Sequence, residues 1–97
     1  MHARVTTING SSDQVDAGIS NFRENVVAFT REEGGKGSLL LADRHTGKVI
    51  AITLWENEEA LAASEEKANQ LRAQAAEQGR ASQAPTVERY EVAVFEI

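Results

Sequence analysis

The strand-like segments of this chain carry apolar side chains on both faces, and this feature limits the possible folds most. In residues 48–55, for example, Ile50, Ile52 and Leu54 alternate with Val49, Ala51 and Trp55. A sheet that is covered on one side should instead alternate apolar with polar residues. The rest of the chain provides only two amphipathic helices, which can cover one face. We therefore expect a second copy of the chain to bury the other face in a homodimer packed sheet to sheet. A monomer with a ligand on its open face is the alternative.

The strands are predicted from their composition and from the turn residues beside them. Four segments have this character, and they cover residues 3–8, 38–43, 48–55 and 87–97. Asn9 and Gly10 end the first segment. The second and third segments form a hairpin around a four-residue loop, in which Gly47 can adopt a positive φ. A polar loop through Pro85 leads to the last segment.

Two segments between these strands repeat apolar residues every three or four positions, which predicts amphipathic helices. The first begins at Ser11 and ends before Gly34 and Gly35, a pair that favours a helix C-terminus. Its apolar stripe consists of Val15, Ile19, Phe22, Val26 and Phe29. The second is capped by Asn57 and closed by Gly79. Its inward stripe consists of Leu61, Ser64, Ala68, Leu71 and Ala75.

The resulting order of elements is β-α-β-β-α-β within a single domain that spans residues 1–97. Two right-handed crossovers around a central hairpin place both helices on one face of a four-stranded antiparallel sheet. The sequence therefore predicts an α+β protein with the ferredoxin-like fold.

Composition argues against several classes of function. The net charge is −5 with no basic block, so we expect no nucleic-acid partner. The chain has no Cys, and His2 and His45 lack a paired ligand spacing, so we expect no metal site. No apolar run is long enough to span a membrane, and no basic-then-apolar leader is visible. We therefore expect no membrane partner and a cytoplasmic location.

The passage VIAITLWENEEAL, residues 49–61, resembles the dimeric α+β barrel proteins. It is most similar to the antibiotic-biosynthesis-monooxygenase-like group, in which a Trp-Glu-polar-x-x-Ala turn leads from the third strand into the second helix. The closing VERYEV, residues 87–92, is also similar to the last strand of that group. The resemblance extends along the whole chain and implies dimerisation through the open sheet face. The Trp-Glu turn is typical of the fold and of no single reaction.

This resemblance implies one of three activities. Some members are cofactor-independent monooxygenases of aromatic polyketide-like or quinol substrates, and the substrate itself supplies the electrons to dioxygen. Others bind and degrade haem, and many have no established reaction. The haem-degrading branch has an Asn on the first strand and a Trp and an axial His on the second helix. An ungapped alignment from Trp55 places Ala3, Ser64 and Gln74 at those positions, so we expect no haem and no other cofactor.

A cofactor-independent monooxygenase needs an apolar cavity for a flat substrate and dioxygen, with one or two polar groups inside it. The candidate cavity residues are Trp55, Phe22, Phe29, Ser64 and Leu71. Trp55 either forms a wall of the cavity or belongs to the core. Ser64 either binds a substrate oxygen or bonds back to its own helix. The small residues of the second helix either leave a space or let the helix pack closely on the sheet.

No His or carboxylate falls on either helical stripe, so no catalytic residue is identified. Two functions therefore remain open. The first is a cofactor-independent monooxygenase or binder of a small aromatic compound. The second is a non-catalytic dimer that binds a small ligand or serves as an accessory protein. A closed cavity lined by Trp55 and Phe22 with a polar group inside would favour the first, and a filled interior would favour the second.

Overall fold

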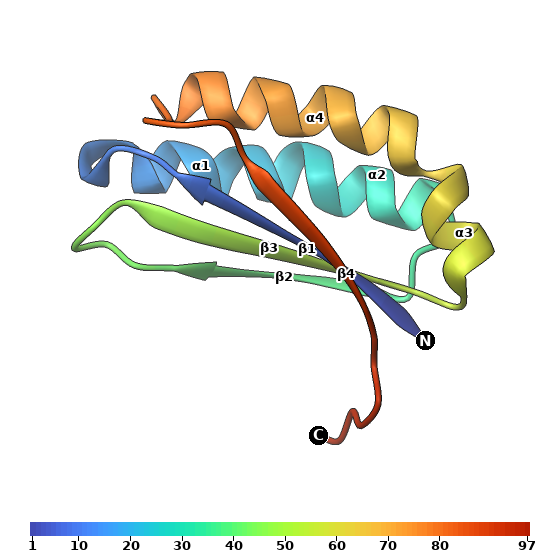
Figure 1. The fold of residues 1–97 in the computed structure, drawn as a ribbon. Helices are drawn as coiled ribbons and strands as arrows, with labels where there is room; N and C mark the ends of the chain where they lie inside the picture. The colour runs from blue at the N-terminus through green and yellow to red at the C-terminus, as the bar shows by residue number, and fades with distance from the viewer.

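Four antiparallel strands form one sheet in the order β2-β3-β1-β4, and all helices lie on one side of it (Figure 1). The computed structural model describes residues 1–97. The strands are β1 (His2–Asn9), β2 (Gly37–Ala42), β3 (Lys48–Trp55) and β4 (Thr86–Glu91). This topology confirms the ferredoxin-like α+β fold that the order of elements predicted.

The first helical segment is continuous from η1 to α2. It comprises η1 (Ser12–Gln14), α1 (Val15–Asn21), η2 (Phe22–Val26) and α2 (Val27–Glu32). η2 is a stretch of π-helix, which the apolar periodicity did not reveal. Such stretches insert an extra residue into a helix and often occur at functional sites. The side chains of Phe22 and Val26, at its two ends, point toward the sheet.

The second helical segment consists of two helices, α3 (Glu58–Ala63) and α4 (Glu65–Gln78), where one continuous helix was expected. Asn57 caps α3 as predicted, because its side chain accepts a hydrogen bond from the Ala60 N–H at 2.8 Å. The break lies at Ser64, whose hydroxyl donates to the Leu61 carbonyl at 2.8 Å. This bond back to the preceding turn competes with the regular helical ladder, and it explains why the helix bends there.

The β2–β3 hairpin has the predicted loop. Asp43 accepts hydrogen bonds from the backbone N–H groups of His45 and Thr46, which holds the turn closed. Gly47 has a φ of 87°, and a Cβ atom at this position would collide with the carbonyl of Gly10. Glycine is therefore required here for both backbone conformation and space.

The strand register divides the sheet residues between two faces. Arg4 lies opposite Thr53 on β3 and Arg89 on β4, so these three share the face that the helices cover. We call this the covered face. The other side, the open face, carries apolar residues that no helix covers: Val5, Leu39, Leu41, Ile50, Ile52 and Tyr90. The prediction that both faces of β2 and β3 are apolar is thus confirmed.

The last strand is shorter than predicted. It ends at Glu91, and residues 92–97 leave the sheet on the side away from the helices (Figure 1). The reason is that β1 begins at His2, which pairs with Glu91, so no further residue of β1 remains to bond beyond Val92. This tail is apolar yet exposed, and the Val94 side chain is 82% accessible.

The apolar core between the sheet and the helices is small. Its central cluster consists of Phe29, Trp55, Leu61 and Ala68. Ala60 and Leu71 pack against it, at the end of the sheet where α3 meets α4. None of the helices has the combination of length and apolar character that crossing a bilayer requires.

Candidate functional site

A narrow cavity lies between the helices and the covered face. Twenty-two residues surround a volume of only about 80 Å³. Its apolar walls come from three strands and both helical segments, and they include Ile8, Val15, Phe22, Val26, Phe29, Leu40, Val49 and Leu71. Typical small-molecule sites enclose roughly 300 Å³ or more. A bicyclic or larger aromatic ligand therefore requires the helices to move apart from the sheet.

Small residues on both helical segments explain why space remains between the helices and the sheet. Gly18 on α1 and Ala68 and Ala75 on α4 all line the cavity. A Cβ atom at Gly18 would meet no other atom within 4 Å. Of the two alternatives for the small residues of the second helix, the structure shows the one in which they leave a space.

The polar lining of the cavity is rich in hydrogen-bond donors and has no acidic group. It consists of Arg4, Thr6, Ser11, Gln14, Asn21, Thr53 and Arg72. Arg4 and Arg72 are the only ionisable residues among those that line the cavity, which include no His, Asp or Glu. The cavity thus combines apolar walls with two guanidinium groups.

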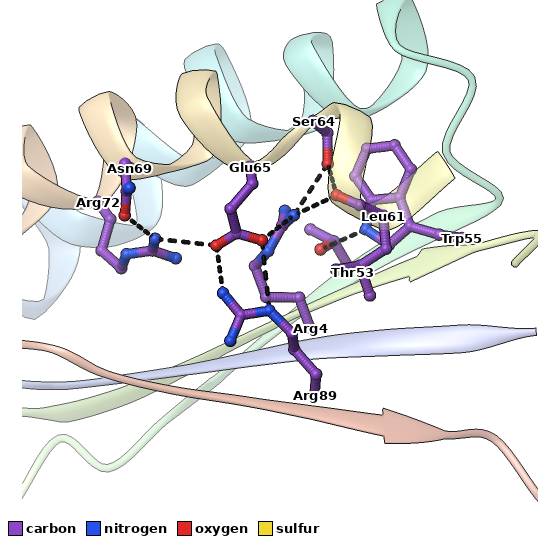
Figure 2. A network of polar contacts seen from close by, with 9 residues as sticks. All are labelled: Arg4, Thr53, Trp55, Leu61, Ser64, Glu65, Asn69, Arg72 and Arg89. Atoms are coloured by element: carbon purple, nitrogen blue, oxygen red, sulfur yellow. Dashed lines mark hydrogen bonds and ion pairs between the residues drawn. The ribbon is translucent and has the colours of Figure 1, made fainter. Parts of the chain in front are cut away.

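Arg4 is the most deeply buried charge of the molecule, with 3% of its side chain exposed. Its Nη2 atom donates to the Leu61 carbonyl at 2.8 Å, to Ser64 Oγ at 2.9 Å and to Glu65 Oε2 at 3.0 Å (Figure 2). The guanidinium carbon also lies 5.6 Å from the centre of the Trp55 ring, within the range of a cation–π interaction.

Glu65 joins three arginines into one network (Figure 2). Besides Arg4, it accepts from Arg89 Nε at 3.3 Å and from Arg72 Nη2 at 3.4 Å. Partial burial raises the pKa of Glu65, but the hydrogen bond from Arg89 and the charge of Arg4 outweigh this effect. The pKa of Glu65 is therefore lower than its ordinary value. Burial, with a smaller effect from the charges of Arg72 and Arg89, lowers the pKa of Arg4 although Glu65 raises it. Both groups remain charged at neutral pH.

The five candidate residues from the sequence separate into two groups. Phe22, Phe29 and Leu71 line the cavity. Trp55 and Ser64 do not line it. Trp55 is fully buried in the core cluster, where its Nε1 donates to Thr53 Oγ1 at 2.9 Å. The hydroxyl of Ser64 bonds back to its own helix and accepts from Arg4, so Trp55 and Ser64 support the cavity from behind its wall.

Sequence reasoning missed the arginines. Arg4 alternates with Ala3 and Val5 on β1, and it shares its face with Thr6 and Ile8. That alternation is the signal that could have placed a charge inside, because the face with Ile8 is the one the helices cover. Nothing in the local sequence of Arg72 distinguishes it from an exposed arginine on a helix.

All three positions aligned with the haem-degrading branch lie outside the cavity lining, Ser64 as described above and Ala3 and Gln74 for separate reasons. Ala3 belongs to the opposite sheet face from Arg4, since it pairs with Leu54 and Tyr90. Gln74 is exposed on α4. The residue of β1 that lines the cavity at this level is therefore Arg4 and not Ala3.

Similar structures share this architecture. A monooxygenase from ActVA-Orf6 of Streptomyces coelicolor, solved in complex with nanaomycin D, superposes with a TM-score of 0.75 at 16% identity, covering 99% of this chain and 92% of that one. A proposed antibiotic biosynthesis monooxygenase from Deinococcus radiodurans gives a TM-score of 0.75 at 18% identity, covering 100% and 98%. At these identities the likeness establishes the fold.

Sequence relatives are closer in identity but longer. An uncharacterised protein of Mycobacterium tuberculosis is 38% identical over 96 residues, which cover 98% of this chain and 42% of the relative. A second from the same organism is 40% identical over 77 residues, which cover 78% of this chain and 33% of the relative. This chain thus spans less than half the length of either. Residues 1–76 match the model of the family described as antibiotic biosynthesis monooxygenase, and the chain therefore belongs to that family.

Proposed function

We propose that this protein binds a small aromatic compound of polyketide-like or quinol-like type in the cavity and oxidises it with dioxygen, without a cofactor. The observation that supports this most is the cavity itself, which combines Phe22 and Phe29 in its wall with buried donors on the covered face. Family membership and the monooxygenase with bound nanaomycin D provide independent support.

The chemistry places few demands on the protein because the substrate supplies the electrons. Oxidation of the CH₂ group between the aromatic rings of an anthrone to a carbonyl removes four electrons, and dioxygen accepts all four. One oxygen atom enters the product as the carbonyl, and the other leaves as water with the two substrate hydrogens. The cavity would hold the ring between apolar walls and orient its oxygen toward Arg4, Thr6 and Asn21.

We also infer that the active unit is a homodimer through the open face. The apolar open-face residues and the tail at residues 92–97 both need cover, and a second sheet provides it for both. The small core cluster supports the same inference, because a chain of this size gains buried apolar area from an interface.

Substrate oxidation can be tested with a cavity-filling variant. An anthrone is incubated with the protein in air, and dioxygen uptake and formation of the corresponding anthraquinone are followed. We expect turnover above a protein-free control, and we expect Ala75→Leu to abolish it because Ala75 lines the cavity. Ala73→Leu, on the exposed side of α4, is the matched control and should keep full activity.

The same experiment separates the two functions. Binding without turnover would support a non-catalytic ligand-binding dimer, which the absence of a basic or acidic catalyst among the lining residues also favours. Absence of both binding and turnover for aromatic compounds would contradict the proposed function.

A further inference from the structure

We propose that the ligand of this cavity carries an ionised oxygen, a phenolate or a carboxylate, and that Arg4 is the residue that recognises it. This inference rests on the proposed function, since it names the class of aromatic compound that the same cavity takes.

The first support is an excess of buried positive charge. Arg4, Arg72 and Arg89 all contact Glu65, which is the only carboxylate that contacts any of them. The two arginines that line the cavity have side chains only 3% and 9% exposed. Buried charges are normally paired, because removing an ion from water is costly. Arg89 is 48% exposed, so the buried balance is two guanidinium groups against one carboxylate, which leaves room for one further anion.

The second support is the set of unused donors on Arg4. A guanidinium group has five N–H bonds. All three hydrogen bonds of Arg4 leave from Nη2, which has only two hydrogens. Nε is buried and has no acceptor, and Nη1 donates to no protein group. Buried donors in native proteins nearly always have a partner, so the free donors of Arg4 favour a ligand oxygen or an ordered water beside this residue.

The third support is the character of the other polar groups around the cavity. Thr6 and Asn21 are buried and line it, and each offers a donor. The Thr6 hydroxyl makes no hydrogen bond to the protein, whereas the Asn21 carbonyl oxygen already accepts from Asn25 at 2.7 Å. No acidic side chain lines the cavity to repel an anion. The lining thus favours an oxygen that accepts several hydrogen bonds and carries negative charge.

This arrangement also accounts for the missing base. A guanidinium beside a bound phenol stabilises the phenolate and so lowers the pKa of the phenol. The proton leaves to solvent when the ligand binds, and no side chain has to remove it. Arg4 thus makes a His or carboxylate base unnecessary for this deprotonation.

The test compares benzoate with benzamide, which has nearly the same shape and no charge. Trp55 is the only Trp and packs on Arg4, so its fluorescence reports binding. We expect benzoate to bind about tenfold to a hundredfold more tightly than benzamide, as a charged hydrogen bond provides. A second probe, 4-nitrophenol, should bind as its coloured phenolate at a pH where the free compound is protonated.

Variants assign the preference to Arg4. Arg4→Gln should reduce the affinity for benzoate to that for benzamide and leave benzamide unchanged. Arg44→Gln removes the same charge from an exposed residue of the hairpin that does not line the cavity, and it should alter neither affinity. If Arg4→Gln does not fold, Arg72→Gln should give a smaller loss in the same direction.

The outcomes separate this inference from the proposed function. Equal affinity of the wild-type protein for benzoate and benzamide would overturn the anion inference, leave aromatic binding intact, and assign the unused donors of Arg4 to water. Absence of binding by any aromatic probe would overturn the proposed function itself, and the anion inference with it.

Discussion

The face of the sheet that the helices bury has more polar residues at its centre than the face that they leave open, which is the reverse of what burial alone would produce. The covered face, which the helices bury, carries Arg4, Thr6 and Thr53 in its central strands. The open face is aliphatic along the same strands, with Val5, Ile50 and Ile52. In a monomeric protein we would expect the polar residues outside. The difference teaches that the covered face is suited to holding a ligand, and the open face to packing against a protein.

The comparison also explains how stability is distributed. The covered face lacks close apolar packing at its centre, where the cavity and the arginine network lie. The central apolar cluster lies around Trp55, and Ile8, Val15 and Phe22 are also buried where they line the cavity. The ion network around Glu65 and, in our proposal, the dimer interface are two further features on which stability depends. Each can be perturbed separately.

The largest effect should follow from a charge on the open face. Ile52→Lys places an ammonium group in the proposed interface, and burying it without a partner costs about 4 kcal/mol. The dissociation constant of the dimer should therefore rise about a thousandfold while the monomer stays folded. Sedimentation velocity and circular dichroism measure the two quantities. Gln74→Lys, on exposed α4, is the control, and a wild-type mass near 10.5 kDa would contradict the dimer itself.

Removal of the counterion on the covered face should have the next largest effect. Glu65→Gln leaves the buried Arg4 without a carboxylate, and we expect a loss of about 3 kcal/mol in the free energy of unfolding at pH 7. Urea denaturation measures it. Asp16→Asn removes an exposed carboxylate paired with Arg44 and should cost about 0.5 kcal/mol or less. Equal losses in the two variants would show that burial adds nothing to the network.

The pH dependence of the Glu65→Gln effect follows from the direction of the pKa shift. The pKa of Glu65 is lowered from its ordinary value of 4.5, so the folded state favours the ionised form. The stabilisation is fully present above that value and is lost as the pH falls through the lowered pKa. The difference in the free energy of unfolding between wild type and Glu65→Gln should therefore be constant above about pH 5 and decrease in more acidic buffer.

The smallest effects should come from two threonines of the covered face. Thr53 accepts a hydrogen bond from Trp55, so Thr53→Val should lower the free energy of unfolding by about 1–2 kcal/mol. Thr6 has no protein partner, so Thr6→Val should change stability by less than about 0.5 kcal/mol. We expect Thr6→Val to weaken binding of benzoate instead. Thermal unfolding with and without benzoate distinguishes a structural hydroxyl from a ligand-binding one, and a loss of stability in Thr6→Val would contradict this assignment.

Local patterns determined a large part of this molecule. The β2–β3 hairpin, its Gly47 turn and the Asn57 cap follow from a few neighbouring residues, and the structure has all three. Alternation along β3 correctly separated Ile50 and Ile52 from Val49 and Ala51. These features are predictable because period-two alternation and turn geometry depend on short stretches of chain.

Contacts between distant segments decided the rest. The end of β4 at Glu91 depends on where β1 begins, and nothing in the apolar run up to Ile97 indicates it. The break at Ser64 is likewise invisible in a periodicity that continues across it.

The candidate site shows the same division. The apolar stripes identified Phe22, Phe29 and Leu71 from the sequence alone, because core-facing positions recur with the helical period. Arg4 became a site residue only in the folded chain, where Glu65 and Trp55 meet it from more than fifty residues away and make its burial tolerable. The sequence by itself determined the fold and its apolar faces, since each depends on local periodicity. The tertiary structure alone decided which charges lie inside, since a buried charge depends on partners that folding brings together.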